Sequence, residues 1–159
     1  MSNIDARLRA LGYELPVAEA SSGARRFRAV RILGSRALIA GHGPQNRDGS
    51  VATPLGKVGR DLTIEQACLA ARLTGLSMLG SLERALGDLD RIANWGRVFG
   101  MVNSAPGFNQ QPAVMNGFSE LILDVFGSEI GAHSRSSVGM AELPGDIPVE
   151  IEAEVEIVV

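Results

Sequence analysis

Residues 148–159 read PVEIEAEVEIVV, and the architecture of the chain can be inferred outward from them. Apolar and acidic side chains alternate over this stretch, and a period of two is typical of a strand with one buried face. The apolar face needs a layer to pack against, and the acidic face must lie on the side that this layer leaves uncovered. The two faces carry Val149, Ile151, Ala153, Val155 and Ile157, and Glu150, Glu152, Glu154 and Glu156, respectively.

Two helices predicted upstream can form that layer. Thr63 and Gln66 have the spacing of a capping box, and the helical stripe that follows ends at Gly87, which suits a helix C-cap. A second apolar stripe at helical spacing covers residues 112–126 and ends before Gly127. The apolar face of the last strand should therefore pack under two helices.

Strand patterns complete the order of elements. With the helices between the strands, we expect an α+β fold with two helices packed on one face of a mixed β-sheet. Residues 1–24 precede it as an N-terminal extension, a short helix (3–11, with Asn3 as its cap) and a loop, so the main domain spans 25–159. The predicted strands are residues 26–33, 36–41, 92–102, 135–141 and 148–158, the first two joined by a tight turn at Gly34 and Ser35.

The uncovered face of this sheet is polar without being fully solvated. Four glutamates in a row repel one another, so water, a cation or another subunit should face them. A two-layer sheet of this kind often closes by association, and we therefore expect an oligomer.

The composition restricts the classes of function. Acidic and basic residues are intermixed at a net charge of −3, so no nucleic-acid surface is expected, and the basic cluster at 25–28 is best explained as a solvated hairpin edge. The single cysteine, Cys68, fits packed core in a reducing compartment. We find no cysteines and histidines at the spacing of a zinc site and no signal peptide. We also find no run that approaches the ~20 apolar residues of a membrane helix. We expect a cytoplasmic protein with no metal, organic cofactor or membrane partner.

Generic catalytic motifs are missing too, so the residues alone leave three candidates: Arg135 at the start of one strand, Glu150 in the next, and His42 at a glycine turn. Structural interpretations compete with each, because an arginine beside acids is most often an ion pair and His42 suits a turn. If the last two strands form a hairpin centred near residue 145, Glu150 lies opposite residue 140 and Arg135 lies beyond it. A cleft could instead combine Arg135 with groups of a neighbouring chain.

Residues 134–157, SRSSVGMAELPGDIPVEIEAEVEI, resemble the C-terminal signature of the Rid family of reactive intermediate deaminases, also called YjgF-like or L-PSP endoribonuclease-like. That signature is an Arg-Ser pair, a short strand, Leu-Pro and Val-Glu-Ile-Glu. NGFSELILDVFG (116–127) and LGSRALIAGHGP (33–44) resemble the family's second helix and second strand. The resemblance implies a chorismate-mutase-like fold, a homotrimer with clefts at subunit boundaries, and hydrolysis of enamines or imines to keto acids and ammonia.

The resemblance also implies roles for single residues. Arg135 would hold the substrate carboxylate, since a guanidinium offers a bidentate fork that stays charged, and Glu150 would position or activate water. Asn116 matches a helix asparagine near the site, Gly41 a glycine whose backbone approaches the ligand, and Ser137 follows Arg135 on the same strand face.

One departure from the family pattern opens an alternative. Phe27 stands where deaminating members carry a tyrosine, so a hydroxyl that orients water or substrate is missing. The sequence therefore predicts either a deaminase acting on a small carboxylate-bearing metabolite or a trimeric carboxylate-binding protein without turnover. Ribonuclease activity rests on a family label alone, and the acidic balance speaks against it.

Overall fold

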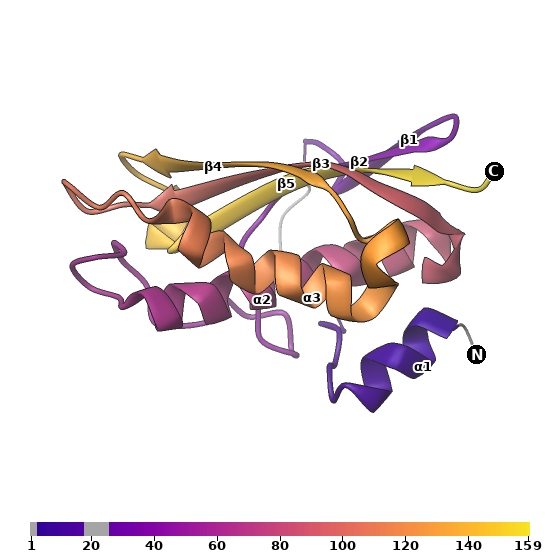
Figure 1. The fold of residues 1–159 in the computed structure, drawn as a ribbon, viewed down its shortest axis with the longest axis horizontal. Coiled ribbons are helices and arrows are strands. Elements are labelled where there is room, and N and C mark those ends of the chain that lie inside the picture. Colours follow the sequence, from indigo (N-terminus) through magenta and orange to yellow (C-terminus); the bar gives the residue numbers. More distant parts are fainter. Residues whose placement is uncertain (1–2, 18–25) are drawn as a thin grey trace.

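The structure is a computed structural model that describes residues 3–17 and 26–159, and Figure 1 shows its arrangement. Short 3-10 helices lie at Leu89–Arg91 and Pro144–Asp146. The strands of this described part are β1 (Val30–Leu33), β2 (Arg36–His42), β3 (Ile92–Asn103), β4 (Ser134–Met140) and β5 (Val149–Ile157), and its α-helices are α1 (Asn3–Ala10), α2 (Ile64–Leu86) and α3 (Gln111–Ile130).

The five strands form one mixed sheet in the order β1-β2-β5-β3-β4. β5, the last strand in the sequence, lies at the centre and is antiparallel to both β2 and β3. β1 and β4 are the edge strands, and β4 pairs with β3 in parallel. The segment β3-α3-β4 is therefore a parallel crossover unit, and the chain then passes β3 to place β5 on its other side.

The predicted hairpin of the last two strands is wrong. β3 lies between β4 and β5, so Glu150 pairs with Met101 of β3 and not with residue 140, while Arg135 pairs with Val98 of β3. A short connection makes a hairpin the natural expectation, because strands consecutive in sequence usually pair. Here the 3-10 helix at Pro144–Asp146 carries the chain across the end of β3 instead.

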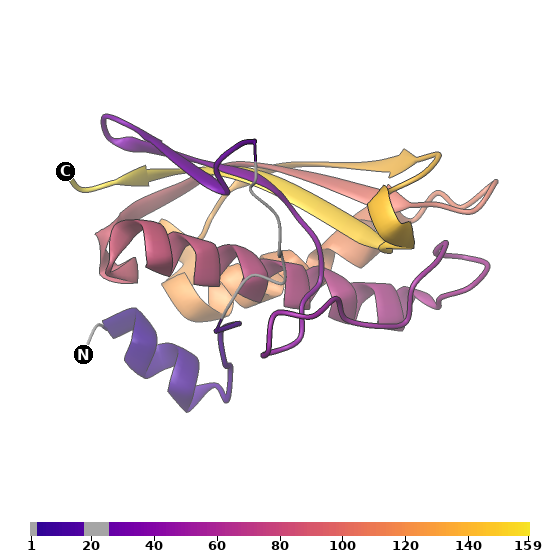
Figure 2. The same ribbon diagram turned by 180° about the vertical axis from the view of Figure 1, so that it is seen from behind.

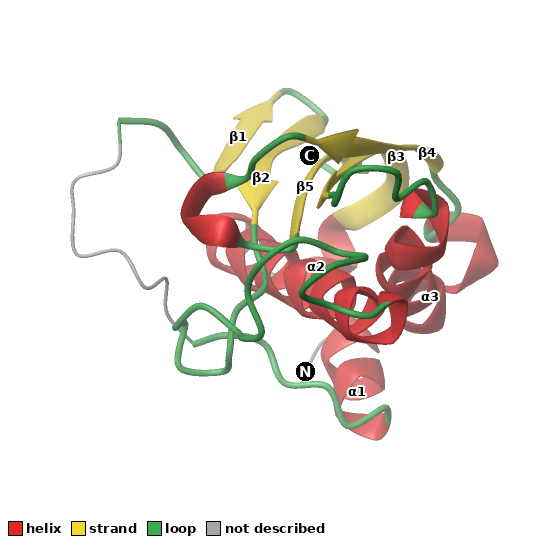
Figure 3. Cartoon of the chain, turned by 90° about the vertical axis from the view of Figure 1, so that its left-hand side faces the viewer, coloured by secondary structure: helices red, strands yellow, loops and turns green. Residues whose placement is uncertain are grey.

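The sheet has one covered and one uncovered face, as the alternation in β5 predicts. All five apolar residues of the alternation are buried, whereas Glu152 and Glu156 are exposed and Glu150 and Glu154 half-buried. α2 and α3 lie side by side against the apolar face (Figures 2 and 3). The prediction of two helices on one face of a mixed sheet is confirmed.

The ends of α2 are those that the sequence predicts. The Thr63 hydroxyl accepts from the Gln66 amide, and the Gln66 side chain accepts from the Thr63 amide, which completes the capping box. Gly87 takes the left-handed conformation at φ 79° and donates its N–H to the Glu83 carbonyl. In α3, Gly127 leaves helical geometry at φ 76° as expected, but one further turn follows and reaches Ile130.

Two glycines bring α2 and α3 into close contact. A Cβ at Gly75 would lie 2.7 Å from Leu121 Cδ2, and a Cβ at Gly117 would overlap the Cys68 carbonyl. Each glycine therefore accommodates the other helix where a side chain would not fit. Cys68 itself is half-buried at this contact, in agreement with a packing role.

The N-terminal helix α1 lies on the outer side of the helix layer, away from the sheet (Figure 3). Its Leu8 is part of the main core. The predicted cap is wrong, because Asn3 is already helical: the Asn3 and Ile4 amides donate to the Asp90 carboxylate at 2.7 and 2.9 Å. The predicted boundary between residues 24 and 25, and Arg25 of the basic cluster, lie outside the described residues.

Candidate functional site

The first group of candidate site residues lies where α3 meets the edge strand β4. Arg135 and Ser137 pair with Val98 and Gly100 of β3, and these β3 residues face the helices together with Ala153 and Ile151 of β5. The two β4 side chains therefore share one strand face, as predicted, and that face is the helix side of the sheet. Both residues are half-buried.

The Arg135 guanidinium is held by α3. Nη1 donates to Asn116 Oδ1 at 3.2 Å and to Ser119 Oγ at 2.9 Å, and Nη2 donates to the Pro112 carbonyl at 3.3 Å. All three acceptors are neutral, so the ion-pair interpretation of Arg135 finds no support among the described residues. Burial lowers the pKa of Arg135, yet a guanidinium remains charged at any working pH. Asn116 and Arg135 are thus brought together as the resemblance implied.

Two residues that sequence reasoning missed extend this group. Ser119 Oγ lies 2.9 Å from His133 Nε2, and His133 Nδ1 lies 2.7 Å from the Gly131 carbonyl. The His133 ring also packs edge-to-face on Phe118 at 5.8 Å between centroids. The signal was present, because Ser119 follows Asn116 by one helical turn and His133 stands two residues before Arg135, the spacing of one strand face.

The second group lies on β5 and β2. A Cβ at Gly41 would overlap Glu150 Oε1, so the carboxylate lies directly over the Gly41 backbone on the uncovered face, and any side chain at position 41 would displace it. The register between β2 and β5 shifts between Ile39 and His42, which marks a β-bulge around Gly41. Burial, and to a smaller extent the charge of Glu152, raises the pKa of Glu150.

Phe27 stands beside this second group and is 61% exposed. It borders a hollow of about 420 Å³ on the uncovered face and a smaller one of about 90 Å³ next to Gly41. The larger hollow combines aromatic, cationic and acidic walls, among them Phe27, Arg28, Arg31, Phe99, Glu152 and Glu154.

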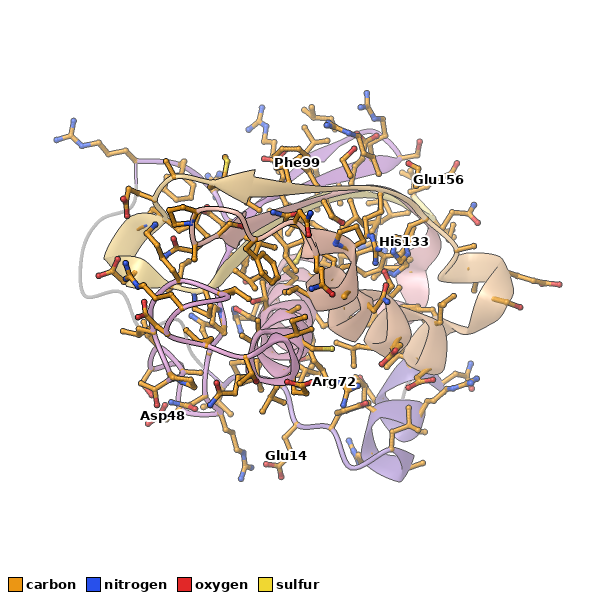
Figure 4. The ribbon with its side chains drawn as sticks, turned by 60° about the vertical axis from the view of Figure 1, so that its left-hand side comes forward. Glu14, Asp48, Arg72, Phe99, His133 and Glu156 are labelled. Atoms are coloured by element: carbon orange, nitrogen blue, oxygen red, sulfur yellow. The ribbon has the colours of Figure 1, made fainter. Side chains whose placement is uncertain are left out.

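Two further glutamates of the acidic row, Glu154 and Glu156, bond residues of their own chain. Arg36 holds Glu154 through two bonds, Nε to Oε1 at 2.5 Å and Nη2 to Oε2 at 2.9 Å, and the pKa of Glu154 is lowered by this contact. Asn94 Nδ2 donates to Glu156 at 2.9 Å. Figure 4 shows Phe99 and Glu156 on the uncovered side of the sheet and His133 on the side of the helices.

The two groups cannot meet within one chain. Arg135 projects from the edge strand to the helix side, whereas Glu150 projects from the central strand to the uncovered side, with β3 between them. A small molecule cannot touch both through the sheet. The structure thus separates a cationic half-site (Arg135, Asn116, Ser137) from an acidic half-site (Glu150, Gly41, Phe27).

His42 is not a turn residue. It ends β2, is 9% exposed, and lies with Nε2 at 2.9 Å from Ser81 Oγ and Nδ1 at 2.6 Å from the Ala40 carbonyl. Both ring nitrogens therefore have partners within the fold, which is the geometry of a structural histidine.

Residues 3–17 and 26–159 contain no cluster of three or more histidine, cysteine or acidic side chains arranged to hold a metal ion. Within the same ranges, each helix is too short or too polar to cross a lipid bilayer.

Comparisons with known proteins identify the relatives of this chain. The family model described as "YjgF/chorismate_mutase-like, putative endoribonuclease" matches residues 5–146. Protein TCP17 of Trypanosoma cruzi is 39% identical over 154 residues, 97% of this chain and 94% of that protein. The crystal structure of Atu1372 from Agrobacterium tumefaciens is also 39% identical, with a TM-score of 0.87 over 98% of this chain and 92% of its own.

The fold extends to more distant proteins. E. coli TdcF, solved with bound serine, is 19% identical and has a TM-score of 0.59, covering 91% of this chain and 99% of its own. This likeness concerns the fold alone. Together with the family match it confirms the chorismate-mutase-like fold that the resemblance predicted.

Proposed function

Because the chain belongs to the YjgF/chorismate-mutase-like family, we propose that it is a Rid-type enzyme that hydrolyses carboxylate-bearing enamines or imines to a keto acid and ammonia. The reaction would take place in clefts between the subunits of a homotrimer. The observation that supports this most is the division of the site, since a cation suited to a carboxylate and a half-buried acid lie on opposite faces of one sheet.

The cationic half-site would bind the substrate. Arg135 is half-buried, has no acidic partner among the described residues, and stays charged, so it can hold a carboxylate through paired N–H bonds. Partial desolvation strengthens such a contact relative to one in open water. The relative TdcF was solved with serine, a small molecule that carries a carboxylate, which accords with a ligand of this class.

The acidic half-site would supply the proton chemistry. As water attacks the imine carbon, Glu150 takes a proton from it, the C–O bond forms, and the electrons of the C=N bond move to nitrogen. Glu150 returns this proton to nitrogen, which gives a carbinolamine. Glu150 then takes the proton of the new hydroxyl and passes it to the amine, so that the C–N bond breaks, the carbonyl forms and ammonia leaves. A glutamate whose pKa is raised by burial is a stronger base than an exposed one and suits both steps.

Association of subunits would bring the two half-sites together. β4, which carries Arg135, is an edge strand, and an exposed edge favours contact with another chain. The uncovered face also carries Phe99 and a hollow of about 420 Å³ beside the acidic half-site. Light scattering should give the mass of a trimer at micromolar concentration, and a monomer would contradict this part of the proposal.

The decisive experiment is an assay with freshly generated 2-aminoacrylate, followed by release of pyruvate and ammonia. Wild-type protein should accelerate both above the spontaneous rate. Glu150→Gln keeps shape and removes the base, so turnover should fall about 100-fold or more while pyruvate binding is retained. If wild type leaves the spontaneous rate unchanged, the deaminase proposal fails.

Phe27 favours a second candidate, a trimeric carboxylate-binding protein without turnover. Its ring offers no hydroxyl to orient water at the acidic half-site. In that case wild type binds pyruvate but does not accelerate hydrolysis, and Phe27→Tyr is the variant that should gain turnover. Ribonuclease activity, which the family description mentions, is disfavoured by the net charge of −3.

A further inference from the structure

Three N–H groups of Arg135 donate hydrogen bonds to residues of α3, and the two other N–H groups of the guanidinium remain for a ligand. A guanidinium has five N–H donors. Both donors of Nη1 and one of Nη2 reach described residues, namely Asn116, Ser119 and Pro112. The remaining two donors are on Nε and Nη2, neighbouring nitrogens on one edge, which is a fork that can take both oxygens of a carboxylate.

The edge of the Arg135 guanidinium that remains for the ligand is determined by the residues that bond Nη1. Asn116 is exposed, so its amide can rotate away at little cost, whereas Ser119 is half-buried. The Ser119 hydroxyl accepts from Arg135 Nη1 and lies 2.9 Å from His133 Nε2. A hydroxyl that accepts from a cation is polarised, and it donates more strongly to its own acceptor.

The backbone fixes the direction of this chain of bonds. The Gly131 carbonyl can only accept, so His133 must carry its proton on Nδ1, 2.7 Å away. In neutral imidazole Nε2 is then an acceptor, and the Ser119 hydroxyl donates a hydrogen bond to it. The bonds therefore run in one direction, from Arg135 through Ser119 and His133 to the Gly131 carbonyl.

We propose that Ser119 and His133 are positioning residues that hold Nη1 of Arg135 and so aim its Nε–Nη2 edge at the carboxylate of the ligand. Neither residue touches the ligand; both act through Arg135. This inference rests on the proposed function for the identity of the ligand, but the Arg–Ser–His arrangement itself can be tested without turnover.

The test compares variants in pairs. Ser119→Ala removes the hydroxyl and Ser119→Thr keeps it, while His133→Phe keeps the ring packing on Phe118 and His133→Gln keeps an acceptor. Pyruvate binding followed by NMR titration should weaken roughly 10-fold in Ser119→Ala and by a smaller factor in His133→Phe, as expected for loss of one bond to a charged group. The Thr and Gln variants should recover most of the affinity.

Kinetics separate positioning from chemistry. With 2-aminoacrylate, Ser119→Ala should raise KM and leave kcat nearly unchanged, because bound substrate still reaches Glu150. Ser81→Ala is the matched control: it removes a helix serine that also bonds a histidine and an arginine, but on α2, whereas Arg135 bonds residues of α3. It should leave the affinity for pyruvate at the wild-type value.

Side-chain NMR spectroscopy of His133 and Arg135 tests this proposal separately from the deaminase proposal. In wild type, side-chain ¹⁵N NMR should show the Nδ1–H tautomer of His133 and hindered rotation of the Arg135 guanidinium, and Ser119→Ala should release that rotation. If wild type neither binds pyruvate nor hydrolyses 2-aminoacrylate but shows these signals, the deaminase proposal fails and the positioning arrangement stands. If Ser119→Ala leaves both the Arg135 signals and the affinity for pyruvate at wild-type values, the positioning proposal is overturned.

Discussion

Among the described residues the same Arg–Ser–His arrangement occurs twice, and the two copies differ in which donors of the arginine remain for other partners. In one, Arg84 Nη2 donates to Ser81, whose hydroxyl meets His42 Nε2, and His42 Nδ1 meets the carbonyl two residues earlier. In the other, Arg135, Ser119 and His133 repeat this pattern, again with Nδ1 on the carbonyl two residues earlier.

Their surroundings decide their roles. Ser81 and His42 are buried between α2 and β2, and Arg84 Nη1 donates to the Pro16 carbonyl, so this copy ties the N-terminal segment to the helix layer. Ser119 and His133 are half-buried beside an edge strand, and their arginine keeps two donors that no described residue receives. The comparison teaches that one hydrogen-bond pattern can stabilise a fold where it is enclosed and position a cation where it meets an edge.

Removing the two arginines should separate these roles most strongly. Arg135→Ala should weaken pyruvate binding at least about 100-fold, because two charge-assisted bonds are lost, and should leave the fold intact. Arg84→Ala should keep the affinity and lower Tm by roughly 2 °C, as expected for an exposed arginine that anchors a segment. Isothermal titration and thermal melts on both variants measure this.

Equal affinities for pyruvate in the two arginine variants would show that Arg135 is not the carboxylate site. If Arg135→Ala instead unfolds the protein, as circular dichroism would detect, then Arg135 is structural and the two arrangements do not differ in the way described.

The two serine variants should differ in stability, with the larger loss of unfolding free energy in Ser81→Ala. Ser81→Ala removes the buried hydrogen bond between Ser81 Oγ and His42 Nε2, which costs about 1 kcal/mol of unfolding free energy. Ser119→Ala exposes its partner nitrogen to a half-solvated region and should cost well under 1 kcal/mol. Urea unfolding of both variants gives the free energies, and a larger loss in Ser119→Ala would contradict the distinction between an enclosed and an edge arrangement.

The sequence predicted the parts of the fold that local patterns control. The alternation of β5 identified its buried and uncovered faces, and the capping box at Thr63 and the cap at Gly87 located both ends of α2. These features depend on residues within a few positions of one another, so one chain contains all the information needed. The pairing of strands does not depend on neighbouring residues in this way, because the placement of β5 between β2 and β3 depends on the crossover through α3.

The candidate site was predictable to a similar degree. Arg135 and Asn116 lie together as the resemblance implied. Ser119 and His133 were missed although their spacing from Asn116 and Arg135 places them on the same faces, because that spacing alone does not show that α3 and β4 meet. Glu150 was placed on the correct face, whereas its distance from Arg135 could not be inferred while the strand order was unknown. The arrangement of Arg84, Ser81 and His42 was also missed, because Ser81 and His42 are far apart in the sequence and no local pattern connects them.

The smallest expected effect concerns pH and tests the direction of the bonds around His133. Burial lowers the pKa of His133 below its ordinary 6.5, and the charge of Arg135 on β4 lowers it further, against the bond to the Gly131 carbonyl, which raises it. α3 faces the ring with the neutral Ser119 and Phe118.

Because the folded pKa is depressed, the unfolded chain takes up a proton first as the pH falls below about 6.5, so stability from this residue is lost on acidification. Comparing melts at about pH 7.5 and about pH 5.5, wild type should lose a few tenths of a kcal/mol more than His133→Phe, roughly 1 °C in Tm after solvent screening of a half-exposed group. If wild type instead gains stability relative to His133→Phe on acidification, His133 is protonated in the fold, Nε2 donates to Ser119, and the bonds run the other way. The neutral tautomer, and with it the likeness between the two Arg–Ser–His arrangements, would then have to be given up.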